Sequence, residues 1–380
     1  MDALTTPSNW QRVRLGDIAE IIGGGTPSTQ ITSFWNGSIN WFTPTEIGIT
    51  KYVYKSQRTI TPLGLKKSSA KLLPIGTILL TSRASIGDCA ILKEVATTNQ
   101  GFQSLIPLEK INNEFLYYLM LTLKNKLLKL ASGSTFLEVS PNKIKNLLIP
   151  LPPLNEQIAI ANILSDVDHY LYTLDALILK KESVKKALSF ELLSQRKRLK
   201  GLNQAWQRVR LGDICEITTG SLDANEMVHY GKYRFYTCAK EYYFIDKYAF
   251  DTEAILISGN GAYVGYVHYY KGKFNAYQRT YVLDNFSEHI MFVKYFLTMF
   301  LQSHIQTNRN EGNTPYIVMA TLKDFEILLP PLNEQIAIAN ILSALDNEII
   351  SLKNKKRQFE NIKKALNHDL MSAKIRVLKK

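Results

Sequence analysis

One stretch of this chain occurs twice, and the repetition restricts what the chain can fold into. The sequence Leu-Pro-Pro-Leu-Asn-Glu-Gln-Ile-Ala-Ile-Ala-Asn-Ile-Leu-Ser runs from Leu151 to Ser165 and recurs unchanged from Leu329 to Ser343. A second motif, Trp-Gln-Arg-Val-Arg-Leu-Gly-Asp-Ile, begins at Trp10 and again at Trp206. Because internal repeats mark repeated structural units, we expect a chain built from two copies of one unit.

The doubled stretch predicts the start of a long helix. Pro152 and Pro153 prevent a helix before them, and Asn155 can cap the next turn. Glu156 then lies where the helix dipole favours an anion. A helix should therefore begin at about Asn155, and an equivalent helix should begin in the second copy.

Apolar residues after each start return at heptad spacing, which is typical of a coiled coil. In the first copy we expect two rows, Ile160, Val167, Leu174 and Leu188, and Ile163, Tyr170, Leu177 and Val184. In the second copy the corresponding residues are Ile338, Ile341, Leu345, Leu352, Phe359, Ile362 and Leu366. The two helices should pack on each other as a coiled coil; the alternative is the core of an ordinary helical hairpin.

Composition narrows the class of protein. The chain has 380 residues, 46% of them hydrophobic, a formal net charge of +13 and a sequence pI near 9.4. This predicts a globular protein of two or more domains with a polyanionic partner, nucleic acid first and a membrane surface second. The three scattered cysteines and the lack of a signal peptide or membrane-spanning run favour a cytoplasmic protein.

Motifs for catalysis are not found in the sequence. The ATP-binding Gly-x-x-x-x-Gly-Lys-Ser/Thr loop, His-Glu-x-x-His and Gly-x-Ser-x-Gly are all lacking. Leu-Pro-Pro-Leu has only a superficial likeness to the Asn-Pro-Pro-Tyr motif of amino-methyltransferases. The histidines show no metal-ligand spacing: His169, His229, His268, His289, His304 and His368. We therefore expect no catalytic or metal site in this chain.

Two glycine-rich stretches, Gly23 to Gly25 and Gly259 to Gly265, lack the spacing of a phosphate-binding loop. Glycine is placed wherever the backbone needs positive φ, so turns and strand bulges are the favoured interpretation. If the first stretch meets phosphate, a backbone N–H contact to DNA is the more plausible form.

The segment before each long helix differs between the copies but keeps a common frame. Gly37 to Thr43 corresponds to Gly231 to Thr237, and Gln100 corresponds to Gln278. Short β-rich segments with turns, each followed by a helix near 113–130 or 288–302, predict an α+β domain in each copy. Extra residues between 43 and 78 in the first copy suggest surface loops.

The predicted fold class is therefore α+β, with two globular domains separated by two long helices that form an antiparallel coiled coil, related by a pseudo-twofold internal repeat. The predicted divisions are a first variable domain at 1–150, a central helix at 151–200, a second variable domain at 201–328 and a C-terminal helix at 329–380. Helices that stay constant while the globules vary suit a protein whose helices fix geometry and whose globules carry specificity.

Nucleic-acid contact would need cations for phosphates and polar side chains that can contact base edges from loops. Each variable domain offers such residues next to apolar runs. The candidates in the first are Asn40, Thr43, Thr45, Ser82, Arg83, Asn99, Gln100 and Phe102. The candidates in the second are Arg234, Thr237, Lys240, Ser258, Asn260, Gln278, Arg279 and Tyr281.

The doubled Leu-Pro-Pro-Leu-Asn-Glu-Gln helix starts, the doubled Trp-Gln-Arg openings and Thr-Pro-Thr-Glu-Ile at Thr43 to Ile47 resemble the specificity subunit of type I restriction-modification systems. The resemblance covers essentially the whole chain. It implies two target-recognition domains that read the two halves of a bipartite double-stranded DNA target across a non-specific spacer. Because the domains differ, the two half-sites should differ as well.

The resemblance also implies which functions belong to other chains. A modification subunit, in two copies, would methylate adenine with S-adenosylmethionine, and restriction subunits would translocate and cut DNA with ATP and magnesium. We expect no cofactor on this chain itself. Two alternatives remain open: a scaffold whose basic domains bind RNA or no nucleic acid, and a stand-alone nuclease or methyltransferase.

Overall fold

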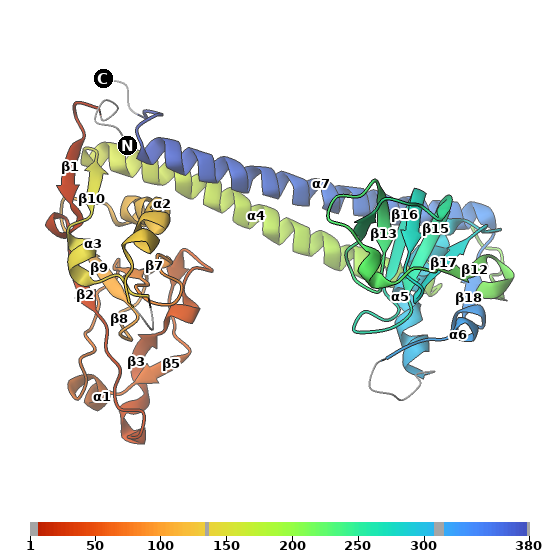
Figure 1. Cartoon of the computed structure of the whole chain (residues 1–380), viewed down its shortest axis with the longest axis horizontal. Helices are drawn as coiled ribbons and strands as arrows, with labels where there is room; N and C mark the ends of the chain where they lie inside the picture. The colour runs from red at the N-terminus through yellow and green to blue at the C-terminus, as the bar shows by residue number, and fades with distance from the viewer. Residues whose placement is uncertain (1–6, 134–136, 308–314, 378–380) are drawn as a thin grey trace. The chain divides into compact units, whose positions relative to one another are not determined.

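The structure is a computed structural model that describes residues 7–133, 137–307 and 315–377. Its chain divides into two compact units, residues 1–175 with 355–380, and residues 176–354 (Figure 1). The boundary passes through both long helices. Most of the opening segment, in which we expect no signal peptide, lies outside the described residues.

The first unit combines three small sheets with helices. Its strands are β1 (Gln11–Arg14), β2 (Ala19–Gly23), β3 (Trp35–Phe42), β4 (Tyr52–Val53), β5 (Arg58–Ile60), β6 (Ile78–Leu80), β7 (Cys89–Leu92), β8 (Ala96–Thr98), β9 (Gln103–Pro107) and β10 (Leu148–Leu151). The sheet orders are β2-β9-β6-β7-β4, β5-β3-β8 and β1-β10. Its helices are α1 (Pro62–Lys66), α2 (Asn113–Leu130), α3 (Pro141–Lys145), the first part of α4 (Leu154–Leu193) and the last part of α7 (Leu332–Met371).

The second unit has one larger sheet and one small one. Its strands are β11 (Gln207–Arg210), β12 (Glu216–Thr219), β13 (Tyr233–Tyr236), β14 (Tyr243–Ile245), β15 (Phe250–Ser258), β16 (Val267–Ala276), β17 (Thr280–Asp284) and β18 (Glu326–Leu329). The sheet orders are β12-β17-β15-β16-β13-β14 and β11-β18. Its helices are α5 (Ile290–Thr307), α6 (Met319–Lys323), the last part of α4 and the first part of α7.

Two predicted helices are found where the sequence places them. The helix expected near 113–130 is α2, whose first turn is capped by Asn112 accepting from the Phe115 N–H. The helix expected near 288–302 is α5, which begins two residues later and continues to Thr307. The long helices begin at Leu154 and Leu332, one residue before the asparagines expected to cap them. The α+β class and the internal repeat are confirmed.

The core of each unit joins its sheet, its medium-length helix and the long helices. In the first unit, Phe115 and Tyr118 of α2 pack in one cluster with Ile160 and Leu164 of α4. In the second, Phe292 of α5 packs in a cluster with Ile338 and Leu342 of α7. The globular part of each unit is thus packed against the start of the long helix that its doubled motif forms.

The long helices pack antiparallel within each unit, but the second predicted row of the seam is only partly correct. Ile163 packs against the core of the first unit, and the ring centroids of Tyr170 and Phe359 lie 4.6 Å apart. The row from Ile160 through Leu174 is confirmed as the inner face, whereas Leu177 and Val184 are exposed. The buried positions lie one residue further on, at Leu164 and Ile178. In α7, likewise, Ile362 is exposed and Leu342 and Ile349 are buried.

The reason for this error is that lysines occupy seam positions. In the corrected second row, Lys185 of α4 and Lys363 of α7 stand where a heptad pattern would place apolar residues. Each meets a carboxylate of the other helix, Asp346 and Asp168 respectively. A search for apolar heptads passes over such positions and selects the neighbouring apolar residues instead.

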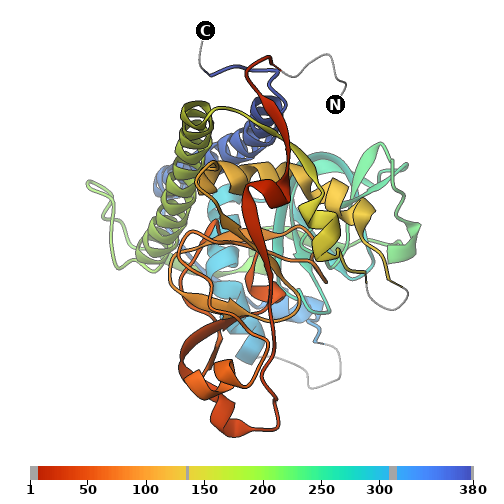
Figure 2. The same ribbon diagram turned by 90° about the vertical axis from the view of Figure 1, so that its left-hand side faces the viewer.

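The extra residues of the first copy are more than a surface loop. They contain β5 and α1, and Ile60 and Ala70 join Phe34, Trp35 and Trp41 in a small core of their own. Gly64 is required there, because a Cβ at this position would lie 2.4 Å from the carbonyl oxygen of Phe34. Figures 1 and 2 show this lobe at the end of the first unit away from its long-helix segments.

Candidate nucleic-acid interface

In the first unit, two parallel strands bring candidate residues to one edge. Phe42 of β3 pairs with Thr98 of β8, so the segments that follow both strands leave the sheet at the same end. Thr43 follows the first strand and Asn99 the second, and the Asn99 N–H donates to the Phe42 carbonyl over 3.0 Å. Gln100 accepts from the Thr26 hydroxyl. These loops therefore form one continuous surface.

The glycine stretch at Gly23 to Gly25 belongs to this surface for steric reasons. A Cβ on Gly24 would lie 1.9 Å from the carbonyl oxygen of Asn99. The Gly25 N–H already donates to the Thr98 carbonyl over 2.8 Å. Close packing of two loops, and not positive φ, is what requires glycine at these two positions.

The second unit repeats this arrangement with different side chains. Tyr236 of β13 pairs in parallel with Ala276 of β16, and the Tyr277 N–H donates to the Tyr236 carbonyl over 2.9 Å. Thr237 and Gln278 follow, as Thr43 and Gln100 do in the first unit. The predicted correspondence of Gln100 with Gln278 is therefore confirmed by the backbone.

The correspondence extends to the loops after the central strands. The Ser82 N–H donates to the Gly101 carbonyl over 2.8 Å, and the Gly259 N–H donates to the Arg279 carbonyl over the same distance. Arg83 forms an isolated bridge with Glu138, and Asn260 forms one with Tyr316. The two units share a hydrogen-bonded frame but differ in the residues that it displays.

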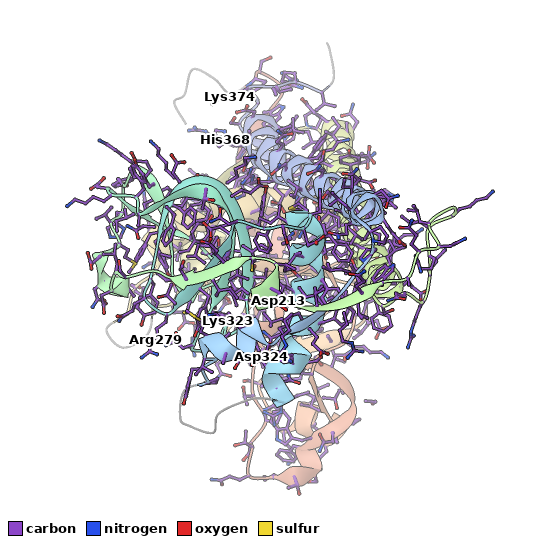
Figure 3. The ribbon with its side chains drawn as sticks, turned by 90° about the vertical axis from the view of Figure 1, so that its right-hand side faces the viewer. Asp213, Arg279, Lys323, Asp324, His368 and Lys374 are labelled. Carbon is purple, nitrogen blue, oxygen red and sulfur yellow. The ribbon has the colours of Figure 1, made fainter. Side chains whose placement is uncertain are left out.

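Burial separates the predicted contact residues into three groups. The exposed residues are Thr45, Gln100, Lys240, Gln278 and Arg279, and Figure 3 labels Arg279 at the surface of the second unit. The half-buried residues are Asn40, Thr43, Arg83, Asn99, Arg234 and Asn260. The buried residues are Ser82, Phe102, Thr237, Ser258 and Tyr281.

The five buried residues take part in packing and hydrogen bonds beneath the loops, and little or none of their surface is open to a ligand. The Tyr281 hydroxyl donates to the Ile317 carbonyl over 2.9 Å, and the Ser82 hydroxyl donates to the Gly101 carbonyl over 3.2 Å. Phe102 and Ser258 are fully buried, and Thr237 nearly so. Their place next to exposed loop residues explains why the sequence pattern included them.

Some half-buried candidates also have internal partners. Asn40 accepts from the Ser56 N–H over 3.2 Å and donates to the Tyr54 carbonyl over 3.3 Å. Arg83 pairs with Glu138 over 2.8 Å. Thr43 donates to Glu46 over 2.8 Å. These side chains help to order the loops that carry the exposed residues.

The structure also contains a buried carboxylate in each doubled motif whose role the sequence did not reveal. Glu334 accepts from Nε and an Nη of Arg198, both over 2.9 Å, and from the Trp206 indole N–H over 3.1 Å. Glu156 accepts from Nε of Arg376 over 2.8 Å and from the Trp10 indole N–H over 3.1 Å. We call each trio a carboxylate clamp.

The glutamine of each motif orients the recognition globule. Gln157 accepts from the Asn112 N–H over 2.9 Å, at the start of α2, and donates to the Pro152 carbonyl over 2.9 Å. Gln335 accepts from the His289 N–H over 3.0 Å, just before α5, and donates to the Pro330 carbonyl over 2.8 Å. The doubled motif thus binds the globule of its own unit as well as starting a helix.

A tyrosine links each globule to the polar layer of the long helices. Tyr295 donates to Asp346 over 2.7 Å, and Asp346 also pairs with Lys185. Burial acts to raise the pKa of Asp346, but hydrogen bonds from Lys185 and Tyr295 outweigh it and hold that pKa below its ordinary value. In the first unit Tyr118 donates to Asp168 over 2.5 Å.

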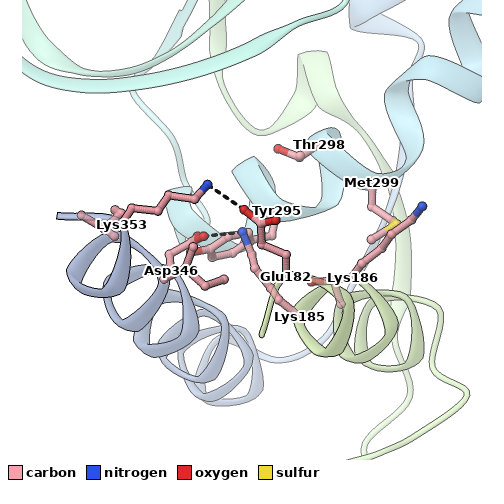
Figure 4. A pocket seen from close by; sticks show the side chains of 11 residues that line it. Glu182, Lys185, Lys186, Tyr295, Thr298, Met299, Asp346 and Lys353 are labelled. Carbon is pink, nitrogen blue, oxygen red and sulfur yellow. Dashed lines mark hydrogen bonds and ion pairs between the residues drawn. The ribbon is translucent and has the colours of Figure 1, made fainter. Parts of the chain in front are cut away.

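Beside this layer lies a cavity of about 550 Å³ in the second unit, between α4, α5 and α7 (Figure 4). Lys185 pairs with Asp346 across it, and Lys353 pairs with Glu182 over 2.6 Å. The first unit has a cavity of about 700 Å³ at the equivalent place, lined by Leu121, Leu171, Glu360, Lys363, Lys364 and Asn367, among others. The duplication therefore extends to concave surfaces with the same basic residues.

Neither a metal cluster nor a membrane helix is found in the part of the chain that the structure describes. No group of three or more His, Cys, Asp or Glu side chains there is placed to hold a metal ion. None of the helices among the described residues is long and apolar enough to cross a membrane.

Comparison with known proteins agrees with this duplicated architecture. A family model described as the type I restriction modification DNA specificity domain matches residues 7–182 and again 203–361. The MjaIX specificity subunit of Methanocaldococcus jannaschii is 30% identical over 413 residues, which cover 98% of this chain and 94% of that protein. The EcoDI specificity subunit of Escherichia coli is 38% identical over 170 residues, 44% of this chain and 37% of its own length.

Solved structures show the same fold. The crystal structure of the S subunit from M. genitalium matches with a TM-score of 0.63 at 18% identity, covering 98% of this chain and 97% of that one. The HsdS subunit from Thermoanaerobacter tengcongensis matches with a TM-score of 0.52, also at 18% identity, over 97% of this chain and 98% of that one. At these identities the likeness concerns the fold alone.

Proposed function

Because the chain belongs to the family of type I restriction-modification DNA specificity subunits, whose catalysis resides in partner subunits, we propose that it reads a bipartite, asymmetric DNA target. Each recognition globule contacts one half-site, and the partners methylate adenine or cut the DNA that this chain has selected. One observation carries the proposal of asymmetry: equivalent loops share backbone hydrogen bonds but display different side chains, such as Arg83 against Asn260.

The contacts to DNA come from the exposed and half-buried loop residues. Gln100 and Gln278 occupy equivalent, exposed positions, and a glutamine amide can bond an adenine edge through its donor and acceptor together. Arg279 follows Gln278, and Lys240 lies two residues after Cys238, whose thiol donates to the Arg279 carbonyl over 3.3 Å. Both exposed cations suit phosphate contacts. The net charge of +13 supports DNA as the polyanionic partner.

Two modification subunits bind this chain, one for each repeat. Support comes from the duplicated cavities beside the long helices, which place Lys185 and Lys186 at one and Lys363 and Lys364 at the other. Two equivalent surfaces suit two copies of one partner. Restriction subunits join for cleavage, and the complex acts in the cytoplasm, where it meets the DNA.

The proposed divisions of the chain are recognition domains at 1–150 and 201–328, with helical segments at 151–200 and 329–380. An exchange of domains tests the divisions and the function together. Residues 206–328 would be replaced by the equivalent segment of a family member with a known target, and the methylated adenines would be mapped with modification subunits present. We expect one half-site to change and the other to be retained.

The matched control exchanges the first domain and should change only the other half-site. A change in both halves after either exchange, or in neither, contradicts the proposal. Binding to duplex DNA with and without the mapped site, at rising salt, distinguishes sequence reading from general charge attraction, because phosphate-only binding is lost first. Methylation or cleavage by this chain without partners would instead favour a stand-alone enzyme.

A further inference from the structure

Arg58, which the sequence did not single out, is held on two tryptophan rings in the first unit. Its guanidinium carbon lies 3.7 Å from the centre of the Trp35 ring and 5.4 Å from that of Trp41. The rings meet edge to face with centroids 5.0 Å apart, and they are 8% and 4% exposed. Arg58 itself is exposed, so a fixed platform carries a solvent-facing cation.

The platform belongs to the recognition surface already described. Arg58 of β5 pairs with Trp41 of β3, one residue before that strand ends at the Thr43 loop. The Trp41 indole N–H donates to the Gly25 carbonyl over 2.8 Å, and the next residue, Thr26, donates to Gln100. The chain of contacts from Arg58 to Gln100 is therefore continuous.

The donors of Arg58 are available to a ligand. Within the described residues, no carboxylate forms an ion pair with its side chain and no acceptor receives its N–H groups. An arginine kept for structure would usually have such a partner, as Arg83 has in Glu138 over 2.8 Å. Stacking instead fixes the plane of the guanidinium while leaving its edge, with the N–H fork, open.

The second unit also places an arginine over aromatic rings, although this arginine is half-buried. The guanidinium carbon of Arg234 lies 4.2 Å from the centre of the Tyr242 ring and 4.5 Å from that of Tyr270. The Tyr236 hydroxyl, at 3.4 Å, is its hydrogen-bond partner. Arg234 lies two residues before the end of β13, the strand equivalent to β3. Arg58 lies on β5, the neighbour of β3, whereas Arg234 lies on β13 itself. Each unit therefore carries a ring-mounted arginine near the end of the equivalent strand.

We propose that Arg58 and Arg234 each read a guanine through the major groove, one in each half-site. A planar fork whose orientation is fixed in advance matches the O6 and N7 acceptors of guanine, and it loses less side-chain freedom on binding than a mobile one. Phosphate attraction needs charge but no such platform. The inference rests on the proposed function, because it assigns one contact to each recognition domain.

The test uses the full chain assembled with its modification subunits. Methylation would be measured on a DNA library in which each position of both half-sites is varied, for Arg58→Met, Arg58→Lys, Arg234→Met and Arg234→Lys. Methionine keeps an apolar stem over the rings, and lysine keeps the charge but lacks the fork. Lys67→Ala, an exposed lysine of the same lobe, is the matched control for lost charge.

We expect both Arg58 variants to lose about tenfold to a hundredfold of the discrimination at a G·C pair in the first half-site, with the second half-site unchanged. The Arg234 variants should show the reverse. Lys67→Ala should weaken methylation about equally on all sequences. Thermal unfolding of each complex shows whether a variant has kept its fold; where a methionine variant has not, the lysine variant decides.

Three outcomes overturn the inference: full discrimination retained by the lysine variants, a uniform loss on every sequence, or a half-site without a G·C pair. Each leaves the proposed function intact if the domain exchange still changes one half-site. If the domain exchange fails as well, the proposed function fails with it.

Discussion

At the residue scale, the carboxylate clamps are the sites where stability depends most on the identity of single side chains. Glu334 is buried, and its carboxylate is shared by Arg198 and Trp206. Glu334→Gln should destabilise the second unit by about 3–5 kcal/mol, because it leaves the guanidinium without its counter-charge in a partly buried site. Chemical denaturation monitored by tryptophan fluorescence measures this loss.

The matched control for the clamp is Glu326→Gln, which breaks an ion pair with Arg208 at 2.7 Å in which both side chains are largely exposed. That change should alter the free energy of unfolding by less than about 1 kcal/mol. Equal effects of the two substitutions would show that the buried clamp contributes no more than a surface pair.

Asp346 predicts a dependence of stability on pH. Its pKa is lower in the folded chain than in the unfolded chain, so the unfolded state binds more protons as the pH falls. Its contribution is therefore present above the unfolded value of about 4 and is lost as the pH falls through the folded value. Asp346→Asn should lower the unfolding midpoint at pH 7 and reduce the dependence of that midpoint on pH below about 4.

Unfolding midpoints between pH 3 and pH 7 would test this, with Asp251→Asn as the control because Lys273 lies 3.9 Å from a carboxylate that is largely exposed. If the unfolding midpoint fell equally steeply below pH 4 in Asp346→Asn and in the unsubstituted chain, Asp346 would not be the source of the pH dependence.

At the element scale, the seam of the long helices buries one of two neighbouring apolar residues and leaves the other exposed. Ile178 is 6% exposed and Leu177 is 36% exposed, although the apolar heptad pattern selects Leu177. Ile178→Ala should cost about 2–4 kcal/mol through lost burial and a residual cavity, whereas Leu177→Ala should cost less than about 1 kcal/mol. Urea denaturation measures the free energy of unfolding of both variants. A larger loss in Leu177→Ala than in Ile178→Ala would support the row predicted from the sequence, which contains Leu177.

This seam shows where sequence patterns succeed and where they fail. The helix starts follow from prolines and local capping, so Leu154 and Leu332 could be placed to within one residue. The row at Ile178 could not, because Lys185 and Lys363 occupy its inner positions and are balanced by carboxylates that only the fold brings near. Helix starts depend on neighbouring residues and can be predicted from the sequence, whereas the pairing of seam lysines with carboxylates of the other helix depends on the tertiary structure.

The recognition surface divides in the same way. The equivalence of Gln100 and Gln278 follows from sequence registration, and parallel strand pairing bears it out. Burial of Phe102 and Ser258 could not be derived, because each lies where a strand meets a turn, and alternation along the strand does not determine which face is covered there. Arg58 was not part of any motif, since it lies on β5 whereas both tryptophans beneath it lie on β3.

At the scale of the whole molecule, duplication preserves a frame and varies what the frame displays. Both units contain the carboxylate clamp, the orienting glutamine, the tyrosine that contacts the long helices and the cavity. The loops differ: Arg83 of the first unit corresponds to Asn260 of the second, and Gly101 corresponds to Arg279. Change in one set of loops leaves the shared frame intact. A target made of two independent halves follows from this arrangement when the chain acts as a specificity subunit.

The expectation that the long helices fix the geometry of the target, and with it the spacer between the half-sites, leads to a prediction about helix length. Seven residues inserted after Asp175 in α4 and seven after Asn354 in α7 fall at the unit boundaries. The inter-helix pairs, such as Asp168 with Lys363 and Lys185 with Asp346, each lie within one unit and so keep their partners. At about 1.5 Å per residue the insertion adds about 10 Å, or roughly three base pairs of spacer.

Mapping of methylated adenines should then give both half-sites unchanged and a spacer about three base pairs longer. Insertion into α4 alone is the informative contrast, because it lengthens one helix against a partner of fixed length and should abolish methylation instead of resetting the spacer. If the doubly inserted chain is active on the original spacer, the helices do not set the distance between the half-sites.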